Sequence, residues 1–123
     1  MELNTITQGF DNDIFTANLN RDNGYISLGF YNKETHTPIT PGKYMVSRKN
    51  NKDENILPIG KISIDTDYIA KDYEIFRDFC IEQGVTYTYY LQKYNAYNVF
   101  SKPLISNEIM GDFEDMFLTD ETK

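Results

Sequence analysis

The stretch from Ile81 to Pro103, IEQGVTYTYYLQKYNAYNVFSKP, decides the fold of this chain. After a turn at Gly84, residues 85–92 alternate between apolar or aromatic side chains at odd positions and Thr, Thr, Tyr and Gln at even positions. A period of two over eight residues is typical of a β-strand with one buried face. Tyr87 opens this strand just after the turn. We therefore expect it to be the tyrosine corner of a β-sandwich, with its ring in the core and its hydroxyl bonded to upstream backbone.

The rest of the chain shows short β-rich runs separated by turn residues, which predict seven strands in all. They span residues 13–19, 25–31, 43–48, 56–64, 73–81, 85–94 and 99–105. Pro58 and Gly60 interrupt the fourth run, which suits an edge strand or a bulge. In the fifth run the odd positions are expected to face the core, namely Tyr73, Ile75, Phe79 and Ile81, with Arg77 as the exception. Because no helical period is sustained between these runs, the sequence predicts an all-β sandwich.

The chain length of 123 residues fits one domain, or one domain with a tail. We place the sandwich at residues 1–106 and an acidic, partly apolar tail at residues 107–123, leading to a partner or a following domain. Phe113, Met116 and Phe117 lie three and four residues apart in this tail, which fits one or two helical turns. A disordered acidic end explains the same composition equally well.

The net charge of −7 comes from 19 acidic and 12 basic residues, without a basic stripe along the chain. This balance disfavours binding to nucleic-acid phosphates and to anionic lipid. No apolar run approaches the roughly 20 residues that a membrane span needs, and residues 1–10 lack the features of a signal peptide. We expect no nucleic-acid partner and no membrane insertion.

Residue types that carry catalysis or bind metals are few and scattered. His36 has no second His or Cys nearby, and Cys80 is expected to be a small buried hydrophobe of the fifth strand. The acidic residues in segments 11–13 and 65–67 offer oxygens for Ca²⁺ or a glycosidase pair, but ordinary turn chemistry explains them. No glycine-rich phosphate motif occurs. The sequence predicts no catalytic residue, no metal and no cofactor.

Aromatic residues are abundant, with 10 Tyr and 8 Phe. If the odd positions of the 85–92 run face the core, Tyr90 and Tyr94 face outward, and Tyr97 and Phe100 lie in or beside the last hairpin. Exposed aromatic side chains are typical of protein interfaces, although sugar stacking or pairing with neighbours across the sheet also explains them. The candidates for interface residues are Tyr90, Tyr94, Tyr97, Phe100, Phe113, Met116 and Phe117.

The opening stretch resembles fibronectin type III domains, which show Leu-x-Pro-Gly-Thr-x-Tyr-x-Val-x-Val-x-Ala-x-Asn, then a short turn and Ser-x-Pro. The matching residues here are Ile81, Gly84, Tyr87, Tyr89, Leu91, Asn95, Ser101 and Pro103. Gln83, Val85 and Lys93 depart from the pattern, and no Trp occurs in the second strand, where we expect Phe30 to fill the core. The resemblance implies a seven-stranded fibronectin type III or immunoglobulin-like sandwich with a short C-terminal tail.

The ending SNEIMGDFEDMFLTD, residues 106–120, resembles the exit from such a domain in structural proteins of tailed bacteriophages. There a D-F-E-D-x-F-L-x-D segment leads into the next domain. The resemblance implies a non-enzymatic component of the tail, baseplate or neck of a virion, made in the host cytoplasm. Its partners are then other virion proteins or copies of itself. The alternative is a carbohydrate-binding or adhesin module of a bacterial surface protein, which glycan binding through Tyr90, Tyr94 or Tyr97 would favour.

Overall fold

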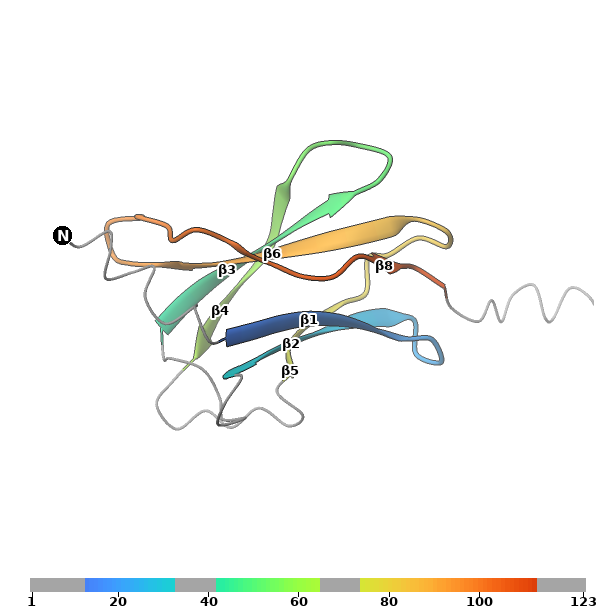
Figure 1. Ribbon diagram of the computed structural model, residues 1–123, viewed down its shortest axis with the longest axis horizontal. Coiled ribbons are helices and arrows are strands. Elements are labelled where there is room, and N and C mark those ends of the chain that lie inside the picture. Colours follow the sequence, from blue (N-terminus) through green and yellow to red (C-terminus); the bar gives the residue numbers. More distant parts are fainter. Residues whose placement is uncertain (1–12, 33–41, 65–73, 113–123) are drawn as a thin grey trace, which may run out of the picture.

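The computed structural model describes residues 13–32, 42–64 and 74–112. This part of the chain contains eight β-strands and no helix. The strands form two antiparallel sheets, of three and five strands, which Figure 1 shows as two layers. The described part of the chain is therefore an all-β sandwich.

The smaller sheet has the strand order β1-β2-β5. Its strands are β1 (Asp13–Asn20), β2 (Tyr25–Asn32) and β5 (Glu74–Asp78). The turn between β1 and β2 closes with a hydrogen bond from the Gly24 amide to the Asn20 carbonyl, 2.9 Å long. Gly24 has a φ of 74°, which glycine adopts without the steric cost that a side chain brings.

The larger sheet has the strand order β4-β3-β6-β7, and β8 pairs with β6 as well. Its strands are β3 (Gly42–Asn50), β4 (Leu57–Ile64), β6 (Thr86–Tyr94), β7 (Leu104–Ile105) and β8 (Ile109–Met110). β7 pairs with the middle of β6, and β8 with its beginning. The fourth strand thus lies at an edge of the sheet, as its proline predicts.

The edge strand β4 also contains the expected bulge. Its register with β3 shifts between Val46 and Ser47, where Gly60 and Pro58 are the partners. A Cβ atom on Gly60 would lie 2.7 Å from the ring of Phe76 in β5. The glycine therefore lets the edge of the larger sheet approach the smaller sheet closely.

The core fills the space between the two sheets. β6 alternates between buried and partly exposed side chains along Thr86–Leu91, as predicted. Phe30 is 1% exposed, and its ring packs edge-on against Tyr44 of the facing sheet at 5.6 Å, so it occupies the core position expected of it. The buried cluster consists of Phe15, Ala17, Ile26, Leu28, Phe30, Tyr44, Val46, Ile64, Ile81, Val85, Tyr87, Tyr89 and Leu91.

The predicted fifth strand, 73–81, is shorter in the structure. Ile75 packs against the core as predicted, but the phase changes after it. Leu28 of β2 pairs with Phe76, while the next residue of β2 pairs with Glu74, so the register shifts by one residue. An extra residue in one strand exchanges the two faces beyond it. Phe76 and Asp78 consequently turn toward the core, which the period-two pattern of the sequence did not predict.

Phe79 and Cys80 lie beyond the end of β5, and their predicted core positions are wrong. Cys80 is exposed, and Phe79 is 60% exposed. The Cys80 amide donates a 3.0 Å hydrogen bond to Oδ1 of Asp78, which is the side-chain turn that Asp often makes. This turn takes the chain out of the sheet at residue 78.

The last predicted strand, 99–105, is divided. Phe100 forms an isolated bridge to Tyr94, and regular pairing resumes only in β7. With β8 added, the described part has eight strands where the sequence predicts seven.

The chain remains part of the sandwich after residue 106, where the tail is expected to begin. The side chain of Asn107 accepts a 2.9 Å hydrogen bond from the Ala17 amide and donates one of 3.0 Å to the Ala17 carbonyl. Gly111 bonds through its amide to the Val85 carbonyl at 2.8 Å. Residues 107–112 therefore join β1 to β6, and residues 113–123 lie outside the described part.

Candidate interaction surface

Tyr87 connects the core to the turn before β6. The residue is 2% exposed, and its hydroxyl accepts a 2.7 Å hydrogen bond from the backbone amide of Glu82. Burial raises the pKa of Tyr87, and the bond from the Glu82 amide partly opposes this rise. Gly84 in the turn has a φ of 83°, and a Cβ on Gly111 would lie 2.3 Å from the Glu82 carbonyl oxygen. This is the geometry that a tyrosine corner requires.

A polar cluster inside the sandwich joins the two sheets. Asp78 of β5 is 4% exposed, and its Oδ2 accepts hydrogen bonds from Arg48 Nη1 of β3 at 2.7 Å and from the Tyr89 hydroxyl of β6 at 2.6 Å. Arg48 also donates to the carbonyl of Cys80 at 2.9 Å. The carboxylate is thus satisfied by side chains from two strands, β3 and β6, as a buried charge must be.

The electrostatics of this cluster favour a fixed structural role. Burial strongly raises the pKa of Tyr89, and the hydrogen bond to Asp78 adds to the rise. Burial alone lowers the pKa of Arg48, but its hydrogen bond and charge interaction with Asp78 outweigh that effect, so the pKa is raised. Both groups therefore keep their protons at neutral pH, and neither is suited to proton transfer.

Sequence reasoning missed the contact between Arg48 and Asp78. The two residues are 30 positions apart, and no local spacing reveals such a pair. The available signal was an ionisable residue at the end of an apolar strand in each case. Such a residue is expected to find a partner when the strand is buried.

Three aromatic residues that are partly or well exposed lie on the outward side of the larger sheet. Tyr90 pairs with Ser47 on one side and with Ile105 on the other, and Tyr94 pairs with Lys43 and Phe100. Residues directly opposite each other in a sheet share one face. We call this surface the aromatic face; it comprises Met45, Tyr90, Tyr94, Phe100 and Ile105, bordered by Lys43 and Lys61.

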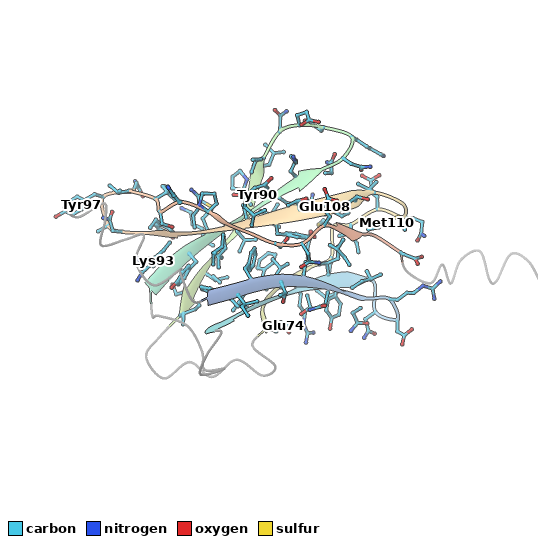
Figure 2. The ribbon with its side chains drawn as sticks, viewed as in Figure 1. Glu74, Tyr90, Lys93, Tyr97, Glu108 and Met110 are labelled. Carbon is cyan, nitrogen blue, oxygen red and sulfur yellow. The ribbon has the colours of Figure 1, made fainter. Side chains whose placement is uncertain are left out.

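The members of the aromatic face contact one another. The rings of Tyr94 and Phe100 stack at 5.2 Å, and Lys61 Nζ lies 5.4 Å from the centroid of Tyr94. Phe100 is 38% exposed, and Ile105 is 58% exposed. Figure 2 shows Tyr90 on the side of the sheet that faces away from the second layer. Three predicted interface residues, Tyr90, Tyr94 and Phe100, are thereby brought onto one surface.

Tyr97 lies apart from this surface, at the tip of the hairpin and at one end of the molecule (Figure 2). It is 85% exposed. The Asn95 side chain accepts hydrogen bonds from the amides of Tyr97 at 2.9 Å and Val99 at 3.1 Å, which fixes the turn. The remaining interface candidates, Phe113, Met116 and Phe117, lie outside the described residues.

Sequence reasoning gave no role to Ile105, which is the most exposed apolar side chain of the aromatic face. A single aliphatic residue on a strand surface needs no explanation by itself. Its importance follows from its neighbour Tyr90, and that pairing depends on the register between β6 and β7.

A concave region, about 640 Å³ in volume, lies on the outward side of the smaller sheet. The aromatic residue of this region is Tyr25, which is 7% exposed; its ring lies 4.9 Å from that of Phe79 and 4.8 Å from the Arg77 guanidinium. Arg77 in turn pairs with Glu74 at 2.8 Å, and Ser27 donates a hydrogen bond to the same carboxylate. Because the ring is buried, this region is poorly suited to sugar stacking.

Within residues 13–32, 42–64 and 74–112, no group of three or more His, Cys, Asp or Glu side chains is placed to hold a metal ion. The same residues contain no helix of the length and hydropathy that crossing a membrane requires. The single histidine, His36, and the acidic residues Asp11, Asp65 and Asp67 lie outside this part of the chain.

The described strands form a β-sandwich, and comparisons with known proteins add one structural likeness. No protein-family model and no curated protein matches the chain. Among solved structures, the crystal structure of a pectate lyase from Erwinia chrysanthemi in complex with tetragalacturonic acid matches with a TM-score of 0.51 and 15% identity. The match covers 80% of this chain but only 27% of the lyase chain. Such a likeness shows the fold alone.

Proposed function

We propose that this chain is a non-enzymatic module of fibronectin type III type that joins protein subunits in a tailed-phage particle. The observation that carries the proposal is the aromatic face. Stacked aromatic rings with a half-exposed aliphatic neighbour and a lysine border have the composition of an interface core with a polar rim.

The fibronectin-like assignment is supported by strand order. In the constant immunoglobulin arrangement, the fourth strand joins the first, second and fifth strands. Here β4 instead pairs with β3, which leaves a three-stranded sheet facing the larger one. The tyrosine contact at Tyr87 and the sequence pattern around it favour the same family.

The non-enzymatic assignment is supported by the state of the buried ionisable groups. Asp78, Arg48 and Tyr89 hold one another inside the fold, where they have a structural task. The activity of the matching lyase is not assigned to this chain, because 15% identity over one part of the lyase identifies no shared catalytic residue.

The placement in a virion is supported by the D-F-E-D-x-F-L-x-D segment at residues 112–120. Antibody raised against the chain should label purified tailed-phage particles from the source of this sequence, seen by immunoelectron microscopy. Absence of the chain from such particles would overturn the placement.

The role of the aromatic face is tested by a matched pair of variants. Ile105→Lys and Leu57→Lys each place a charge on a side chain that is 58% exposed, so each should change the free energy of unfolding by about 0.5 kcal/mol or less. Only Ile105→Lys lies on the aromatic face and should abolish incorporation into particles. Equal incorporation of both variants would show that the face is not the contact.

A carbohydrate-binding module remains the second candidate, because the Tyr97 ring is 85% exposed at a fixed hairpin tip. Glycan-array binding that saturates and is lost in Tyr97→Ala, with the fold intact, would favour it over the particle role. We expect no such binding.

A further inference from the structure

The aromatic face differs in charge from the rest of this acidic chain. Its border carries Lys43 and Lys61, both exposed, on neighbouring strands. At the outward positions around Tyr94, the described strands contribute no acidic side chain. The surface therefore suits a partner that is both apolar and negatively charged.

The chain itself contains a segment with that chemistry. Residues 112–118 read DFEDMFL, with three acidic residues among three large apolar ones and a methionine. The acidic residues complement the lysines, and the apolar ones match the exposed rings of the aromatic face. The segment is therefore a candidate ligand for the aromatic face, either of its own molecule or of another copy.

Chain length excludes the intramolecular contact with the stacked pair. Met110 pairs with Thr86 at the beginning of β6, whereas Tyr94 is at its other end, about 27 Å away at the usual rise per strand residue. Asp112 lies beside Gln83, further still from Tyr94. Residues up to Phe117 extend at most about 18 Å from Asp112.

Figure 1 agrees with this distance, since β8 and the β6–β7 hairpin lie toward opposite ends of the molecule. We propose that the aromatic face of one copy binds residues 113–118 of a second copy, head to tail. The proposal rests on the proposed function and names the partner of the same surface. A head-to-tail contact uses two different surfaces, so it continues from copy to copy into a ring or a filament.

The contact between one segment and one face is small, and interfaces below about 1,200 Å² are weak and transient. Self-association of the full chain should therefore appear only at high concentration. Sedimentation equilibrium should show the weight-average mass of the chain rising beyond that of a dimer, and raised salt should weaken this rise.

Two variants separate the two surfaces. Lys43→Glu with Lys61→Glu changes only the face, and Phe113→Ser with Phe117→Ser changes only the segment. Each variant alone should associate at least tenfold more weakly than the natural chain, with an unchanged circular dichroism spectrum. Their equimolar mixture retains one intact face and one intact segment, so it should form a one-to-one heterodimer that does not grow.

A natural chain that stays monomeric at every concentration would overturn the proposal. So would association that neither variant weakens, or a mixture that forms no heterodimer. A monomeric chain that is still found in particles would leave the proposed function standing with a different partner. If the chain self-associates but is absent from particles, the contact between copies is supported and the virion role is contradicted.

Discussion

Tyr87 shows how one side chain can link sequence pattern, core packing and turn geometry. Its ring is part of the buried cluster, and its hydroxyl holds the amide of Glu82 five residues upstream. The position of Tyr87 was predictable because the alternation that follows the glycine turn identifies which residues near the start of the strand face the core. The hydroxyl therefore has a measurable effect on stability.

Tyr87→Phe should lower the free energy of unfolding by about 1–3 kcal/mol, because the Glu82 amide loses its acceptor. Tyr90→Phe, at a partly exposed position on the outward side of the same strand, should have almost no effect. Urea denaturation of the two variants checks this. Equal midpoints would contradict the register that the structure shows for β6.

The Tyr89 hydroxyl should make the free energy of unfolding depend on pH in the alkaline range. Its pKa in the folded state is raised above the ordinary value of 10.0, so folding favours its protonated form. The stabilisation is then fully present below pH 10 and is lost as the pH rises further, since the unfolded tyrosine ionises and the folded one does not.

Urea denaturation between pH 8 and pH 11.5 should therefore show a steeper decline for the natural chain than for Tyr89→Phe. The slopes should differ by about 1.4 kcal/mol per pH unit above pH 10. Parallel declines would show that the Tyr89 hydroxyl is not held neutral by its surroundings. The slope is informative even if the substitution itself lowers stability.

At the scale of elements, β1, β2, β3 and β6 follow from alternation in the sequence, whereas β5 and β8 do not. A bulge in the pairing of β5 with β2 reverses the phase of β5 after Ile75, and periodicity alone carries no information about bulges. β8 has two residues, too few for any period. The aromatic face was predictable at Tyr90 and Tyr94, but Ile105 joined it only through strand pairing.

The segment after residue 106 should contribute to the stability of the sandwich. In Gly111→Ala, the new methyl group would overlap the Glu82 carbonyl oxygen, which is backbone and cannot turn away. We expect a loss of about 1–3 kcal/mol, the usual cost of overpacking. Asp112→Ala, at a more exposed neighbouring residue, serves as the control and should cost much less.

Thermal unfolding followed by circular dichroism compares these two variants. If Gly111→Ala melts at the temperature of the natural chain, the segment does not pack against the tyrosine corner as described. The domain would then end before β8.

At the scale of the whole molecule, the two layers are held together by an apolar core and by the Asp78 cluster. This leaves the outward side of the larger sheet, with its aromatic face, as the surface on which we base the function. A rigid scaffold suits such a role, since most interfaces of preorganised proteins change little on binding.

The most direct test of the account measures whether the aromatic face is covered in the assembled particle. In a Cys80→Ser background, which removes the exposed natural thiol, Ile105→Cys and Leu57→Cys place single thiols at equally exposed positions. Maleimide labelling should modify both thiols at similar rates in the free chain. In the particle, Ile105→Cys should react at least tenfold more slowly, while Leu57→Cys keeps its rate. Unchanged labelling of Ile105→Cys in the particle would contradict the central claim.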